Sequence, residues 1–166
     1  FLKLYFCQKI FGMNIKLLAI GKTDNKALQT LIDDYTKRLS FYVKFDLEII
    51  ADIKNVKNLS EKQQKEKEGE LILSKIGNTD HLVLLDENGK TFSSAGFADE
   101  LQKKMNAGIK TLVFVIGGPY GFSEEVYKKA NGKISLSAMT FSHQMVRLFI
   151  IEQIYRGFTI LKNEPY

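Results

Sequence analysis

The amino-acid sequence predicts an α/β domain with a mostly parallel sheet and flanking helices. Short apolar runs, typical of buried strands, alternate along the chain with longer segments whose apolar residues recur at helical spacing. Residues 111–116 (TLVFVI) form a continuous run rich in β-branched residues, as expected of a strand covered on both faces. Strands that alternate with helices favour parallel pairing, because each helix carries the chain back to the edge where the previous strand began.

Length and composition fit one globular domain. The 166 residues are 45% hydrophobic and 26% charged, which is ordinary for a folded chain and argues against a disordered one. The formal net charge of +5 permits an anionic partner without requiring one. The single cysteine, Cys7, excludes a disulfide framework, and we expect a cytoplasmic protein. No apolar run reaches the roughly 18 residues that span a bilayer, so we expect no membrane partner.

Residues 1–12 (FLKLYFCQKIFG) are expected to be a leader outside the domain, because the regular pattern begins only at Met13. Two lysines interrupt the apolar residues of this leader, and no small-residue cleavage site follows, so a secretory signal is a poor interpretation. The alternative is an added edge strand or a short helix. The predicted domain spans residues 13–166.

The chain after Met13 predicts a strand, a helix and a second strand. Residues 15–20 form an apolar run that Gly21 ends. Residues 27–39 carry apolar side chains at helical spacing, and Asp24 is the predicted N-cap. The apolar positions of residues 45–50 predict the second strand.

A charged helix follows, and Ser60 is its predicted N-cap. Two acid–base pairs at i,i+4 spacing, Glu61–Lys65 and Lys62–Glu66, favour a helix. We interpret this charge run as a solvated helix face rather than a binding site. Apolar residues later in the helix are expected to dock it on the domain.

The middle of the chain predicts two strands joined by a helix. Residues 81–86 read as a strand with a polar exit, and Asn88-Gly89 is a turn signal. Apolar residues at every fourth position then mark a helix that ends near Gly108. Residues 111–116 are the most clearly predicted strand of the chain.

The loop 117–121 (GGPYG) connects this strand to a short helix that Ser123 caps, and residues 134–136 form the last short strand. Glycines permit close approach of the backbone to a ligand. This loop alone is a weak signal, because it lacks the spacing of a dinucleotide-binding or P-loop motif and could be a turn only.

Three polar or glycine-rich segments, 85–89, 117–121 and 136–141, follow predicted strands and are expected to converge. Ligands of open α/β sheets bind outside the carboxyl ends of the strands. The two histidines, His81 and His143, lie apart from any cysteine or carboxylate cluster in the sequence, so we expect no metal.

The last predicted helix, residues 142–160, is apolar on nearly all sides. Such a helix is buried on more than one side, either inside one chain or against a second copy in a homodimer. Arg147 and Arg156 are its cations. Each could form an ion pair, for instance Arg156 with Glu152, or could contact an anion or a base in the site.

The sequence resembles the RlmH family, which comprises SPOUT-class methyltransferases of large-subunit ribosomal RNA. Four ordered segments carry the resemblance, namely 115–121 (VIGGPYG), 134–147 (ISLSAMTFSHQMVR), 152–156 (EQIYR) and 163–166 (NEPY). The opening 13–21 (MNIKLLAIG) resembles the start of the family, so the resemblance covers the whole predicted domain.

The resemblance implies a SPOUT-type fold with a C-terminal trefoil knot, which is an exception to the rule against knotted chains. It implies S-adenosylmethionine as methyl donor, no metal, and a homodimer that methylates N3 of a pseudouridine in large-subunit rRNA within assembled ribosomes. The positions that would contact the cofactor are Leu85, Gly117, Leu136, Ser137, Ala138, Met139, Thr140 and Phe141.

Arg156 and Tyr166 occupy the motif positions that the family links to catalysis. N3 of the base must lose its proton, so a cation that stabilises the developing anion is useful, and Arg156 is expected to supply it. Tyr166 could stack on the nucleotide or form a hydrogen bond with it. Neither side chain is a convincing general base.

Two departures from the family pattern bear on these expectations. Family members usually continue past the terminal tyrosine with a histidine, whereas this sequence stops at Tyr166. Ser142 stands where the family commonly has proline, and serine can cap the helix instead. Two alternatives therefore remain: a non-enzymatic RNA- or nucleotide-binding module, and a SPOUT methyltransferase that acts on another RNA base.

Overall fold

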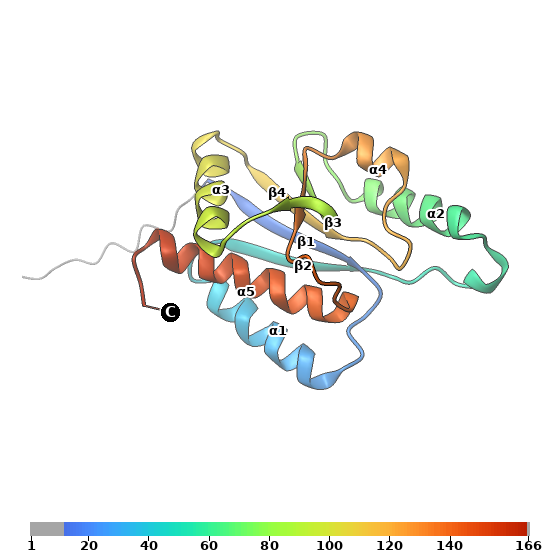
Figure 1. Cartoon of the computed structure of the whole chain (residues 1–166), viewed down its shortest axis with the longest axis horizontal. Helices are drawn as coiled ribbons and strands as arrows, with labels where there is room; N and C mark the ends of the chain where they lie inside the picture. Colours follow the sequence, from blue (N-terminus) through green and yellow to red (C-terminus); the bar gives the residue numbers. More distant parts are fainter. Residues whose placement is uncertain (1–11, 166) are drawn as a thin grey trace, which may run out of the picture.

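The computed structural model describes residues 12–165, and the predicted leader (except Gly12) and Tyr166 lie outside the described residues. Its centre is one five-stranded sheet in the order β2-β1-β4-β3-β5, in which neighbouring strands are parallel (Figure 1). The predicted α/β class, with its parallel sheet and flanking helices, is confirmed. The elements are β1 (Asn14–Ile20), α1 (Lys26–Leu39), β2 (Lys44–Ile50), a 3-10 turn (Val56–Asn58), α2 (Glu61–Ser74), β3 (His81–Thr91), α3 (Ser94–Asn106), β4 (Thr111–Ile116), α4 (Glu124–Lys129), β5 (Gly132–Ser135) and α5 (His143–Leu161).

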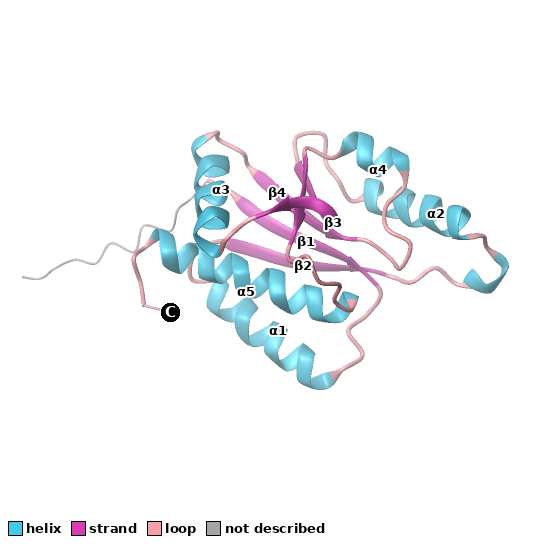
Figure 2. Cartoon of the chain, viewed as in Figure 1, coloured by secondary structure: helices cyan, strands magenta, loops and turns pink. Residues whose placement is uncertain are grey.

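Helices cover both faces of the sheet (Figure 2). On one face, α1, α3 and α5 bury the larger core, which includes Phe114 of β4. On the other face, α2 and α4 bury a smaller core around Val113 and Val115 of the same strand. Successive residues of β4 therefore point into different cores, which explains why its sequence is apolar without interruption.

The helix caps follow the sequence with one exception. Ser60 and Gln63 form a reciprocal capping box at α2, with distances of 3.1 Å and 2.9 Å. The prediction of Asp24 as the cap of α1 is wrong, because the Asn25 side chain accepts the hydrogen bond from the Leu28 N–H at 3.1 Å. Asp24 instead meets Gln144 of α5, which accepts from its backbone N–H at 3.2 Å.

The prediction that a turn at Asn88-Gly89 follows the strand is also wrong, because β3 continues through these residues to Thr91. The pairing of β3 with β5 shifts register between Leu85 and Lys90, and both parts of β3 pair with Ile134. A Cβ on Gly89 would lie 2.5 Å from the carbonyl carbon of Ile134. Gly89 is therefore needed for close backbone approach. The trefoil knot stays a prediction.

Helix α5 is central to the larger core. Its residues Ile150, Ile151, Ile154 and Phe158 are fully buried within one chain, so much of its apolar surface is covered without a partner. Contacts with α1 and α3 provide that cover. Among the described residues, no helix combines the length and apolarity that a membrane crossing requires.

Candidate functional site

A cavity of about 710 Å³ lies at the carboxyl ends of β4 and β5 and beside the middle of β3. The three segments that were expected to converge all contribute to its wall: Leu85 and Asp86 in the middle of β3, the glycine loop after β4, and the segment that follows β5. Parallel strands end at the same edge of a sheet, and the crevice there is the usual ligand site of such folds. Its volume lies within the range of small-molecule sites.

Seven of the eight residues with a predicted cofactor role line this cavity, and Ala138 lies in the same segment but outside the wall. The seven are Leu85, Gly117, Leu136, Ser137, Met139, Thr140 and Phe141. The structure thus brings together residues that are up to 56 positions apart, the separation between 85 and 141. Their contact with a cofactor stays a prediction.

The wall includes charged residues that the sequence analysis set aside. Glu61, Lys62 and Lys65 of α2 line the cavity, as does His143 at the start of α5. The prediction of a solvated face for the α2 charge run agrees with their exposure, because the Lys62 side chain is 82% exposed even at the rim of the cavity. The predicted Lys62–Glu66 ion pair does form, at 3.9 Å. No local pattern marks them as site residues, because the α2 contact with the cavity depends on distant packing.

The glycine loop is shaped by tight contacts as well as by a turn. The Gly121 N–H donates to the Gly118 carbonyl at 3.1 Å, and Gly121 has a φ of +78°, which favours glycine. A Cβ on Gly117 would lie 3.1 Å from the Phe122 ring, and a Cβ on Gly118 would overlap the carboxyl of Glu68. The loop therefore packs closely between the cavity and the side chains behind it.

Asp86 and Tyr127 form a hydrogen-bonded pair in the cavity wall. The Tyr127 hydroxyl donates to Oδ2 of Asp86 at 2.5 Å, and the other Asp86 oxygen accepts from the Asn88 N–H at 2.8 Å. Burial and then the carboxylate of Asp86 raise the pKa of Tyr127 to about 12. The phenol therefore stays protonated at neutral pH and holds the Asp86 side chain in place.

Arg156 lies outside the wall of this cavity. Its Nε donates to Oε1 of Glu152 at 3.4 Å, which confirms the ion pair considered from the sequence. Glu152 lines a second cavity of about 320 Å³, which shares Ile134, Ser135, Leu136, Ser137 and Phe141 with the first. Arg156 is thus paired with a residue of the smaller cavity, which lies next to the larger one. Tyr166, the other predicted catalytic residue, lies outside the described residues.

Arg147 has a structural role that the sequence left open. It is 2% exposed and donates to the Thr23 hydroxyl at 2.9 Å and the Ile20 carbonyl at 2.7 Å. Burial lowers its pKa, and the charges of Asp52 and Asp24 oppose that effect. Arg147 therefore joins α5 to the end of β1 rather than reaching into the cavity.

The polar side chains of the cavity wall carry oxygen and nitrogen atoms that could contact a ligand. Within residues 12–165, no group of three or more His, Cys, Asp or Glu side chains is placed to hold a metal ion. The wall combines apolar Leu85 and Ile116 with polar Asp86 and Thr140. Such a mixture suits an organic ligand with apolar and hydroxylated parts.

Comparison with known proteins identifies the family. The family model described as "Predicted SPOUT methyltransferase" matches residues 13–166. The proteins named ribosomal RNA large subunit methyltransferase H from Flavobacterium johnsoniae and Flavobacterium psychrophilum are 85% and 87% identical over 154 residues, which is 93% of this chain and 98% of each relative. The protein of the same name from Christiangramia forsetii is 68% identical over the same lengths.

A solved structure supports the fold independently. The chain is similar, with a TM-score of 0.50 and 11% identity, to a probable methylase family protein from Haemophilus influenzae, over 93% of this chain and 69% of that one. At this identity the likeness concerns the fold alone. The family match and the close relatives together show that this chain belongs to the SPOUT methyltransferase family.

Proposed function

We propose that this enzyme transfers a methyl group from S-adenosylmethionine to N3 of a pseudouridine in large-subunit ribosomal RNA, as a homodimer acting on assembled ribosomes. The names of the close relatives support the RNA class, and the family supports methyl transfer. The single observation that carries the proposal is the cavity at the carboxyl ends of β4 and β5 and beside β3, because the motif segments meet there. A cytoplasmic location is part of the same proposal.

The cavity suits the methyl donor of the family. S-adenosylmethionine, when bound, supplies a methyl group already activated by a sulfonium. Leu85, Ile116 and Leu136 offer an apolar surface for a purine, and Asp86 and Thr140 offer acceptors and a hydroxyl for its polar groups. Gly117 and Gly118 let the loop pack on Phe122 and Glu68, and the loop backbone forms part of the cavity wall that would face the ligand.

The second cavity is the proposed place of the target base. It holds Phe141 and Phe149, whose ring centroids are 4.9 Å apart in an edge-to-face contact, and aromatic side chains stack on splayed RNA bases. Arg156, oriented by Glu152, is proposed to stabilise the negative charge that develops when N3 loses its proton. The two cavities share wall residues from the 135–141 segment. A base in the smaller cavity would therefore lie across this segment from a methyl donor in the larger one.

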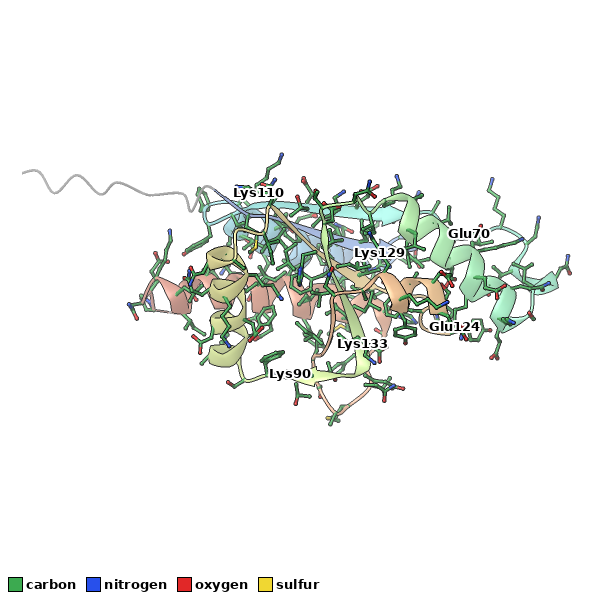
Figure 3. All side chains as sticks on the ribbon, turned by 90° about the horizontal axis from the view of Figure 1, so that it is seen from above. Glu70, Lys90, Lys110, Glu124, Lys129 and Lys133 are labelled. Atoms are coloured by element: carbon green, nitrogen blue, oxygen red, sulfur yellow. The ribbon has the colours of Figure 1, made fainter. Side chains whose placement is uncertain are left out.

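Lysines near the cavity supply a local surface for the RNA backbone. Lys62 and Lys65 line the cavity, and Lys133 lies 5.5 Å from the centroid of the Tyr127 ring. Figure 3 shows Lys90 and Lys133 on the side of the molecule opposite Lys110. These lysines, rather than the modest overall charge, are proposed to bind phosphate groups of the RNA.

Exposed apolar residues support the homodimer. Met139 is 73% exposed and Phe141 37% exposed, and both belong to the segment after β5. A second copy could cover these side chains and complete the site. Light scattering tests this part: a dimer mass is expected, and a uniform monomer would contradict it.

The test of the function combines binding with product mapping. Calorimetry is expected to detect S-adenosylmethionine binding, and ribosomes that lack the modification should then accept one labelled methyl group. Mass spectrometry of the RNA locates that group. Absence of cofactor binding at millimolar concentration would contradict the enzyme assignment, whereas a methyl group on another base would contradict only the proposed substrate.

A further inference from the structure

Glu68 is a buried carboxyl group directly behind the glycine loop. It lies on α2, is 3% exposed, and packs so closely on Gly118 that any side chain there would overlap it. Gly69, the next residue, packs equally closely on Ser123 at the start of α4. Helix α2 thus presses Glu68 against the backbone that forms the cavity wall.

The hydrogen bonds of Glu68 are incomplete within the described part of the chain. Oε1 accepts from Nε2 of Gln64 at 2.9 Å, but Oε2 is buried without a hydrogen-bond partner. Buried carboxylates are costly unless they are paired, and they cost least when a positive charge lies near. A hydrophobic residue or a glutamine would fill this position at lower cost, so the carboxyl group calls for a functional reason.

The charged neighbours of Glu68 do not neutralise it. Burial raises its pKa above the usual value, the Gln64 hydrogen bond lowers it, and across the packing Asp52 raises it while His143 lowers it. Asp52 comes from the loop after β2, and His143 begins α5. The nearest elements therefore supply one repelling and one weakly attracting group.

The missing positive charge can come from the ligand. S-adenosylmethionine carries a sulfonium cation, whereas S-adenosylhomocysteine, which remains after methyl transfer, has lost that charge. Both would occupy a cavity whose wall at Gly118 separates them from the carboxyl group. The carboxylate attracts the sulfonium of the donor across this wall, and the product lacks that charge.

We propose that Glu68 is a specificity-determining residue, whose carboxylate behind the glycine loop favours binding of the cationic methyl donor over its neutral product. Burial favours the protonated form of Glu68 in the free protein, whereas binding of the cationic donor favours the ionised form and the release of a proton to the buffer. The preference helps product leave after each turnover. The inference rests on the proposed use of S-adenosylmethionine.

The test compares dissociation constants for S-adenosylmethionine and S-adenosylhomocysteine by calorimetry. In Glu68→Gln, which keeps the shape and the Gln64 contact, the preference for the donor is expected to fall on the order of tenfold. Glu70→Gln is the matched control, because it removes the same charge from an exposed position of the same helix (Figure 3). That control should leave the preference unchanged.

The pH dependence separates Glu68 from a purely structural role. In the wild-type protein the preference for the donor should rise with pH as Glu68 ionises, and this rise should disappear in Glu68→Gln. His143→Asn removes the imidazole that acts on Glu68 from the start of α5 and should retain the rise. A rise that persisted in Glu68→Gln and vanished in His143→Asn would overturn the proposal.

Two further measurements do not require activity. Calorimetry in buffers of different ionisation enthalpy should detect proton release on donor binding by wild-type protein and by His143→Asn, even if Glu68→Gln fails to fold. Because a raised pKa means that ionisation destabilises the folded state, Glu68→Gln should also melt at a higher temperature than wild type near neutral pH, and the difference should vanish in acid.

The outcomes distinguish the two proposals. If wild-type protein binds both molecules and Glu68→Gln keeps the same preference, the role of Glu68 is wrong and the methyltransferase assignment stands. If wild-type protein binds neither molecule, the proposed use of the cofactor fails first.

Discussion

The β1–β2 pair and the β3–β5 pair are both parallel, but they differ in regularity. β1 and β2 keep one register from Asn14 opposite Lys44 to Ile20 opposite Ile50. β3 and β5 shift register after Leu85, where β3 passes over the backbone of Ile134. The described lining of the larger cavity includes residues of β3 and β5 and none of β1 or β2. The cavity therefore lies beside the irregular pair and away from the regular one.

The largest expected effect on stability is on the regular side. Leu17 of β1 is fully buried, so Leu17→Ala should lower the free energy of unfolding by about 3–4 kcal/mol through lost burial and a residual cavity. Cofactor affinity of the remaining folded protein should not change. Denaturant unfolding and calorimetry check both points. Leu31→Ala, at a position that is 45% exposed, is the control and should change neither.

A matched pair of arginines tests whether function lies on the irregular side. Arg38 pairs with Asp34 on α1 at 2.9 Å and Arg156 pairs with Glu152 on α5, both at i,i+4 spacing. Arg156→Ala should lower methyl transfer to ribosomes on the order of 10²–10³-fold with little change in cofactor affinity, because it removes a charge needed in the transition state. Arg38→Ala should leave activity unchanged. Equal activities of the two variants would reject the role of Arg156.

The irregular pairing itself depends on one missing side chain. A Cβ on Gly89 would meet the backbone of Ile134 and Ser135 at 2.5–2.7 Å, so Gly89→Ala should cost about 2–3 kcal/mol of stability and weaken cofactor binding. Thermal unfolding and calorimetry measure these effects. At Gly132 of β5 a Cβ meets nothing within 4 Å, and Gly132→Ala should change stability by no more than about 0.5 kcal/mol. If the two variants behaved alike, the close approach at Gly89 would be unimportant.

The smallest effect concerns the hydrogen bond between Tyr127 and Asp86 in the middle of β3. Tyr127→Phe removes the hydrogen bond to Asp86 and should cost about 1 kcal/mol. Because the folded-state pKa of Tyr127 is about 12 and the usual value is 10.0, this stability is present below pH 10 and is lost as the pH rises towards 12. The free energy of unfolding of the wild-type protein should fall across this alkaline range. The part of that fall that comes from Tyr127 should be absent in Tyr127→Phe. Tyr120→Phe, which removes a hydroxyl from an exposed tyrosine of the same wall, should behave like wild type.

Much of the fold was readable from local patterns. The continuous apolar run of β4, the capping serines at positions 60, 123 and 142, and the helical spacing of α3 all predicted elements that the structure contains. These signals depend on neighbours along the chain, so the sequence contains them directly. The Asp24 cap failed because Gln144, 120 residues away, binds that residue instead.

The candidate site was likewise predictable from the sequence only in part. The sequence by itself determined the α/β class, the order of the elements and the three segments that end at one edge of the sheet, because periodicity and turn chemistry are local. Only the tertiary structure decided that Gly89 crosses Ile134, that Lys62 reaches the cavity, and that Glu68 is buried behind Gly118. These facts depend on which surfaces pack together across long sequence separations, and burial then sets the cost of each charge.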